Sequence, residues 1–81
     1  MRGKVIGINH NRGLIAIQVD EGDITVAEML GGYSVELGDV IRGDLETVAG
    51  ETFYNITKSE EMEVFVEGWG CDLHGAKMMM R

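Results

Sequence analysis

The chain has 81 residues, seven of them basic and fourteen acidic, so its formal net charge at neutral pH is −7. A domain of this size buries only about 60–65% of the surface that its unfolded chain exposes, which leaves little apolar material for a deep catalytic cleft. The excess of acid also repels polyanions at long range. Length and charge therefore argue against an enzyme and place nucleic-acid binding at a disadvantage.

Hydropathy and cysteine content predict where the chain resides. Its apolar stretches are far shorter than the ~20 residues that span a bilayer, and polar residues 9–12 follow the N-terminus too soon for a signal peptide. The single cysteine, Cys71, excludes an internal disulfide and suits a reducing compartment. We expect a cytoplasmic domain, without membrane partners, that is stabilised by packing alone.

The N-terminal half is expected to form three strands. Residues 4–9 read as the first strand, and residues 14–19 alternate so that Ile15, Ile17 and Val19 share one face. Residues 20–23, three acids and a glycine, predict a hairpin loop between the second and third strands. Calcium binding is disfavoured, because the alternating ligand series of a calcium loop is absent. In residues 24–27 we expect Ile24 and Val26 to face inward.

Three further strands are expected in the C-terminal half. Residues 40–45 direct Ile41 and Leu45 inward, and residues 53–57 direct Tyr54 and Ile56 inward, with Tyr54 a candidate to fill the space at Gly43. Residues 61–67 alternate acidic with apolar side chains and predict a sixth strand. Residues 77–81 form a tail, of which the methionine-rich residues 78–81 are expected to fray.

Short strands separated by glycine-containing turns indicate an all-β fold. We predict a small five-stranded Greek-key barrel of the OB type over residues 1–58, because closure removes exposed sheet edges. Residues 59–76 would add the extra C-terminal strand and an extension of the same domain.

Three segments carry a family resemblance. They are Gly3-Lys4-Val5 with Asn9 and Arg12-Gly13, then Gly38-Asp39-Val40-Ile41, and finally Asn55-Ile56-Thr57. In order and spacing they resemble a cold-shock domain over residues 3–58. The resemblance implies an OB barrel that binds single-stranded RNA or DNA, with Lys4 and Arg12 at basic positions of the family.

The chain departs from that family at the positions that stack bases. Small or non-aromatic residues stand there: Gly7, Leu14, Ala16, Thr25, Ala27 and Glu28. Since stacking contributes about 1–3 kcal/mol per base, no stacking residue can be carried over. The remaining basic side chains can contact phosphates without reading sequence.

Two binding hypotheses follow. The first is weak single-stranded nucleic-acid binding through Arg2, Lys4 and Arg12, with Phe53 or Tyr33 as a stacking partner. The second is a protein interaction or self-association module, including a homodimer. Its partner-binding residues would be Leu14 and Ala16 on the flat strand face, and Phe65 and Trp69 in the C-terminal half. Alternatively, the segment after residue 58 covers that flat face, or the two aromatic rings pack across the barrel end.

The sequence supplies no strong metal or catalytic motif. Cys71 and His74 stand three apart, but structural zinc requires four ligands and a second such pair is missing. The same pair lacks a rigid scaffold and an oxyanion donor for nucleophilic catalysis. We therefore predict no catalytic residue, no metal and no cofactor.

Overall fold

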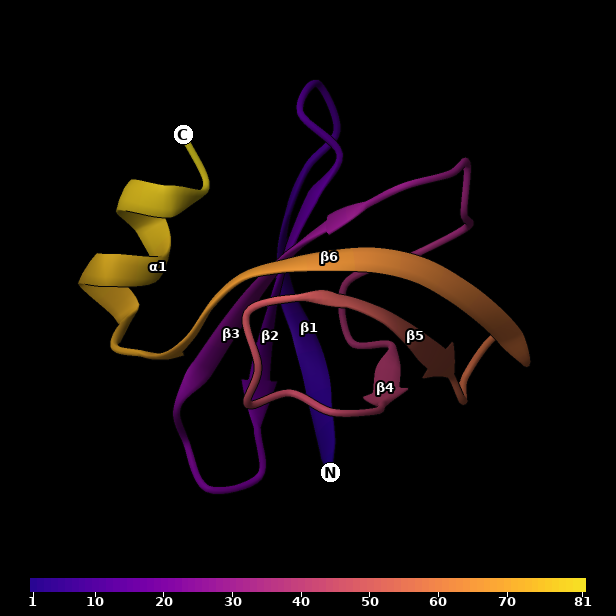
Figure 1. Cartoon of the computed structure of the whole chain (residues 1–81), viewed down its shortest axis with the longest axis horizontal. Coiled ribbons are helices and arrows are strands. Elements are labelled where there is room, and N and C mark those ends of the chain that lie inside the picture. Colours follow the sequence, from indigo (N-terminus) through magenta and orange to yellow (C-terminus); the bar gives the residue numbers. More distant parts are fainter.

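Six antiparallel strands close into one barrel in the computed structural model, which describes residues 1–81 (Figure 1). Each strand pairs with its neighbours in the order β1-β2-β3-β6-β5-β4, and β4 returns to β1. The elements are β1 (Arg2–Asn9), β2 (Leu14–Val19), β3 (Ile24–Met29), β4 (Val40–Arg42), β5 (Gly50–Asn55), β6 (Glu60–Cys71) and α1 (Leu73–Met79). The barrel thus consists of two three-stranded meanders joined by residues 30–39.

The small all-β barrel is confirmed, but its wall differs from the expected five strands. β6 pairs with β3 along one edge and with β5 along the other. The sixth strand is therefore part of the closed wall, and the barrel would be open without it.

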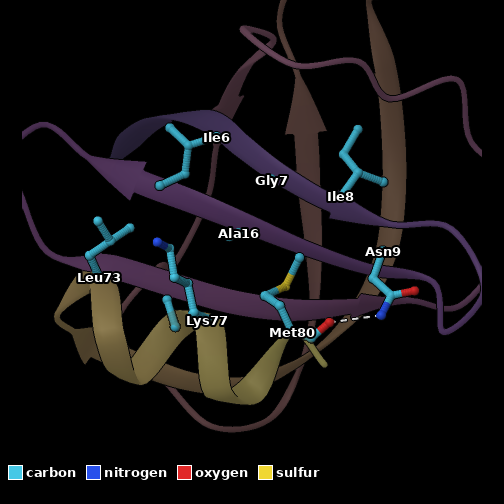
Figure 2. A pocket seen from close by; sticks show the side chains of 9 residues that line it. Ile6, Gly7, Ile8, Asn9, Ala16, Leu73, Lys77 and Met80 are labelled. Atoms are coloured by element: carbon cyan, nitrogen blue, oxygen red, sulfur yellow. Dashed lines mark hydrogen bonds between the residues drawn. The ribbon is translucent and has the colours of Figure 1, made fainter.

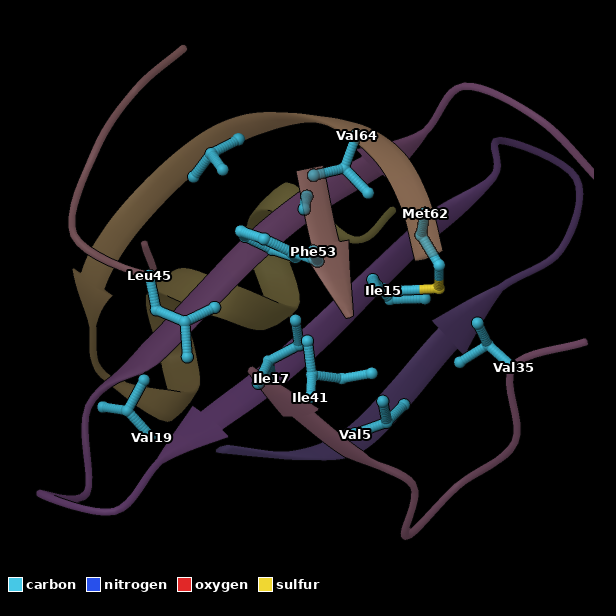
Figure 3. Packing of buried hydrophobic residues seen from close by; sticks show 12 residues of the cluster. Val5, Ile15, Ile17, Val19, Val35, Ile41, Leu45, Phe53, Met62 and Val64 are labelled. Carbon is cyan, nitrogen blue, oxygen red and sulfur yellow. The ribbon is translucent and has the colours of Figure 1, made fainter. Parts of the chain in front are cut away.

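The prediction that Met62, Val64 and Val66 share one face of β6 is confirmed. Met62, Val64 and Val66 are at most 1% exposed and belong to the barrel core (Figure 3). Glu63 and Phe65, which lie between them, remain exposed because they point to the other side of the strand. The core also takes residues from every other strand and from two connections: Val5, Ile15, Ile17, Val19, Ala27, Val35, Ile41, Leu45 and Phe53.

The predicted orientation of β5 was wrong by one residue. Phe53 is fully buried, whereas Tyr54 lies on the outer side with the Arg42 guanidinium 5.0 Å from its ring centre. Phe53, not Tyr54, occupies the space at Gly43, since a Cβ built on Gly43 would lie 2.6 Å from the Phe53 ring. Phe53 is therefore not a surface stacking residue in this structure.

The predicted orientation of β3 was also reversed. Ala27 faces the barrel core, and the Thr25 hydroxyl donates a buried hydrogen bond of 2.7 Å to the Leu45 carbonyl. Ile24 and Val26 form a second apolar cluster on the outer side. Alternation indicated the wrong face, because the larger apolar residues Ile24 and Val26 pack against Ala76 on the outer side, whereas the polar Thr25 is buried through its hydrogen bond to Leu45.

The outer cover of β3 is helix α1, which the sequence analysis did not predict. Ala76 of α1 packs with Ala16, Ile24 and Val26, and Met79 and Met80 flank this cluster. The tail therefore does not fray: residues up to Met79 are helical and packed against the barrel. The helix is too short and too polar to cross a membrane.

Candidate interaction surfaces

The flat face of β2 and β3 is occupied by the chain's own helix. Leu14 and Ala16, which were predicted to bind a partner, are only 3% and 4% exposed. Ala16 lies beneath Ala76 in the outer cluster. The alternative in which the segment after residue 58 covers this face is the one that the structure adopts.

Two residues of the β1–β2 turn region hold the end of that helix. The Asn9 side chain donates a 2.7 Å hydrogen bond to the Met80 carbonyl, and Arg12 donates to the carbonyls of Met79 and Arg81. A cation at a helix C-terminus is also favoured by the helix dipole. Arg12, predicted to contact phosphates, thus has its guanidinium engaged by the chain itself.

The other predicted phosphate contacts, Arg2 and Lys4, lie exposed on β1. Register pairs Arg2 with Arg42 of β4, so both side chains leave the same side of the barrel wall. Lys4, two residues along β1, shares that side. We call Arg2, Lys4 and Arg42 the basic stripe; none of the three forms a salt bridge. Arg42 was not predicted as a phosphate contact, because its place beside Arg2 depends on the β1–β4 pairing.

The two predicted aromatic partner residues remain at the surface on β6. Phe65 is 40% exposed and Trp69 is 47% exposed. Phe65 is paired with Gly50 of β5, which offers no side chain to cover the ring. Glu63 and Glu67, on either side of Phe65, are exposed. We call Phe65, Trp69 and these two glutamates the β6 patch.

A groove of about 290 Å³ opens between β1 and α1 (Figure 2). Its lining is mainly apolar and consists of Ile6, Gly7, Ile8, Asn9, Ala16, Leu73, Ala76, Lys77 and Met80. Lys77 extends from α1 toward the strands and is the groove's only charged residue. No pattern in the sequence predicts this groove, because it exists only where the unpredicted helix meets β1.

One buried carboxylate organises the connection between the meanders. Asp39 is 4% exposed and accepts hydrogen bonds from the Asn55 amide at 2.9 Å, the Glu36 backbone N–H at 3.0 Å and the Lys58 ammonium at 3.0 Å. Lys58 also bridges to Glu36 at 2.6 Å. Burial alone would raise the pKa of Asp39, but these hydrogen bonds outweigh it and hold the pKa below its ordinary value. The cluster is fully satisfied and stabilises the barrel end.

Cys71, the chain's single cysteine, is packed beside the helix. The Cys71 Sγ lies 3.9 Å from the Met79 Sδ, and burial together with the charges of Asp72 and Asp23 raises the pKa of the thiol. A raised pKa reduces the thiolate fraction and hence the nucleophilicity of the side chain at neutral pH. The structure also contains no group of three or more His, Cys, Asp or Glu residues placed to hold a metal ion.

Comparison of the chain with protein families, curated proteins and solved structures finds no match in any of the three.

Proposed function

We propose that the chain is a non-enzymatic binding module that recognises a protein partner through the β6 patch. The observation that carries the proposal is the exposure of two aromatic rings on a strand whose inner side chains are fully buried. Aromatic residues are enriched at the centres of protein interfaces, where they contribute most of the binding energy.

Phe65 is the anchor of the proposed contact. Trp69 follows four residues later, beyond a shift in the β3–β6 register between Val66 and Gly68, so it lies near Phe65 along β6 but not on one uninterrupted strand face. An interface of standard size, about 800 Å² on each partner, covers both rings. The flat face that offered an alternative is already buried beneath α1.

Charge indicates the chemistry of the partner. Glu63 and Glu67 flank Phe65, and the whole chain carries a net charge of −7. A partner that surrounds an apolar anchor with Lys or Arg side chains would complement both features, and its association would be accelerated electrostatically.

The test uses Trp69, the chain's single tryptophan, as the reporter. A peptide that alternates leucine with lysine should shift the Trp69 emission to the blue, and the same peptide with glutamate in place of lysine should not. Phe65→Ala should weaken binding at least tenfold, equivalent to about 1.4 kcal/mol. Leu37→Ala is the matched control, because Leu37 is 67% exposed but lies outside the patch.

Equal affinities of the Phe65→Ala and Leu37→Ala variants would contradict the proposal, as would equal binding of the two peptides. Light scattering of the protein alone distinguishes self-association from binding to a different protein. A rise in mass with concentration, lost in Phe65→Ala, would identify the partner as a second copy of the chain.

A second candidate is weak single-stranded nucleic-acid binding through the basic stripe. It is favoured by the alignment of Arg2 and Arg42, and by Tyr54, whose half-buried ring lies against Arg42. Three phosphate contacts give a slope of about −2 when the logarithm of the binding constant is plotted against that of salt concentration.

Fluorescence anisotropy of a labelled oligonucleotide at several salt concentrations tests this candidate. Arg42→Ala should reduce both the affinity and the slope, whereas Arg81→Ala removes an equal charge outside the stripe and should change them less. Absence of binding at low salt would reject it.

A further inference from the structure

We propose that the groove between β1 and α1 binds a short aliphatic carboxylate. This site is separate from the β6 patch and does not depend on the protein-binding proposal. Its apolar lining would accommodate the hydrocarbon chain, and Lys77 would pair with the carboxylate.

The floor of the groove is open because two strand residues have little or no side chain. Gly7 lies opposite Ala16 in the β1–β2 register, and both line the groove. A Cβ built on Gly7 would meet Ala16 Cβ at 3.7 Å and Met80 Cε at 3.8 Å, which are ordinary contact distances. Gly7 also has no positive φ angle. Neither close packing nor backbone conformation therefore requires glycine here, and its effect is to leave space.

The space is bordered by apolar side chains that remain accessible. Ile6 is 40% exposed and Leu73 is 56% exposed, one on each wall. At about 290 Å³ the groove lies just below the range for small-molecule sites, which is about 300–1,000 Å³. A short chain suits this volume, and a large ring system does not.

The polar groups of the groove favour an anion. Asn9 is already satisfied, because its amide donates to the Met80 carbonyl and its oxygen accepts from the Arg12 backbone N–H. Lys77 forms no salt bridge, and no carboxylate lines the groove. In a chain with twice as many acids as bases, the one charged group at this site is a cation. Lys4, two residues before Ile6 on the same strand, adds a second positive charge nearby.

The experiment compares three six-carbon probes that differ only in the head group: hexanoate, hexanol and hexylamine. Each is titrated into the full ¹⁵N-labelled chain, with Kd near 1 mM expected for hexanoate given its size. Hexanoate should shift the amides of Gly7, Ala16, Ala76 and Lys77. Hexanol should bind about tenfold more weakly, and hexylamine more weakly still.

Two variants test the two halves of the site. Gly7→Val fills the floor and should reduce hexanoate affinity at least tenfold, with Gly7→Ala giving a smaller reduction if the valine variant does not fold. Lys77→Met retains an apolar stem and should lower hexanoate affinity to that of hexanol. Val48→Ala, at an exposed position that does not line the groove, should bind as the unmodified chain does.

Several results would overturn the proposal. Absence of shifts with hexanoate would do so, as would unchanged affinity in a folded Gly7→Val protein. Equal binding of all three probes would reject the role of Lys77. Shifts of the groove amides with protein concentration alone would show that a second copy of the chain occupies the groove instead.

Discussion

Asp39 shows how one buried charge can hold a connection in place. Both of its carboxylate oxygens accept hydrogen bonds, and Lys58 supplies the opposing charge from the residues that follow β5. Asparagine at this position would keep one acceptor oxygen, but it would replace the other with an N–H donor and remove the buried charge opposite Lys58, which would retain only Glu36. We predict that Asp39→Asn lowers the free energy of unfolding by about 2–4 kcal/mol at neutral pH, measured by urea denaturation. Asp20→Asn, at an exposed position, is the control and should change it little.

The direction of the Asp39 pKa shift sets the pH dependence of that effect. Because the folded pKa lies below the ordinary value of 3.8, the carboxylate stabilises the fold above that value, and this contribution is lost as pH falls through the folded pKa. Hydrogen bonds to Glu36 and then Asp39 raise the pKa of Lys58, so its contribution is present below 10.5 and lost at higher pH. Asp39→Asn should therefore show a flatter decline in stability below pH 3.8. A decline as steep as that of the unmodified chain would assign the acid sensitivity to other carboxylates.

Gly43 illustrates a second residue whose identity is fixed by the core. Its φ angle is +157°, and an added Cβ would lie 2.6 Å from the fully buried Phe53 ring. Gly22 has φ of +104° but open space around it. Gly43→Ala should therefore destabilise the protein by about 1–3 kcal/mol more than Gly22→Ala, as measured by thermal unfolding. Equal losses would mean that backbone strain, rather than the clash with Phe53, dominates at both positions.

At the scale of elements, the strands were predictable where only one face is apolar. β6 is the clear case: glutamates at alternate positions left no doubt about which face contacts the core. In β3 the polar Thr25 is buried through a hydrogen bond to Leu45, and in β5 the neighbours Phe53 and Tyr54 are both aromatic, so alternation placed Thr25 and Phe53 on the wrong side. The choice depends on contacts with Leu45, Gly43 and α1, which are distant in the sequence.

Helix α1 was not predicted, because the segment that forms it is too short to show a helical pattern of apolar residues. Asp72 is a good N-cap residue, and the residues after Gly75 favour helix, but α1 has only seven residues and contains a glycine. Its stability depends on packing against Ala16 and Val26 and on the bonds from Asn9 and Arg12. This also explains why the predicted roles of Arg12, Leu14 and Ala16 could not be judged from the sequence.

The N-cap gives a direct test of how firmly α1 is held. The Asp72 carboxylate accepts a 2.7 Å hydrogen bond from the Gly75 N–H, and its loss should cost about 1 kcal/mol. We predict that Asp72→Ala increases the reaction rate of Cys71 with a thiol reagent several-fold, because the helix opens more often. Burial is the largest cause of the raised thiol pKa, with the charges of Asp72 and Asp23 adding to it; Asp72→Asn removes the first of these charges but retains an acceptor. If both variants accelerate the reaction equally, the effect is electrostatic and the helix does not open.

At the scale of the whole molecule, charge is distributed unevenly around the barrel. The basic stripe lies on β1 and β4, whereas β6 carries four glutamates and no basic residue. The one cluster of salt bridges is centred on Lys58, so most of the fourteen acids have no close cation. The folded chain therefore carries unrelieved repulsion between like charges.

Screening of this repulsion predicts the response of the protein to salt. Raising the ionic strength to about 0.15 M shortens the Debye length to about 8 Å, so repulsion among the exposed acids weakens while the buried Asp39 contacts change little. Thermal unfolding at neutral pH should therefore occur at a higher Tm as sodium chloride is added. Near the isoelectric point, about 4.6, the net repulsion is small and the same addition should have little effect.

A fall in Tm with salt at neutral pH would mean that attraction between the basic stripe and the acidic side of the barrel outweighs repulsion. That result would also favour head-to-tail contact between copies, because the two surfaces that attract within one molecule would attract between molecules.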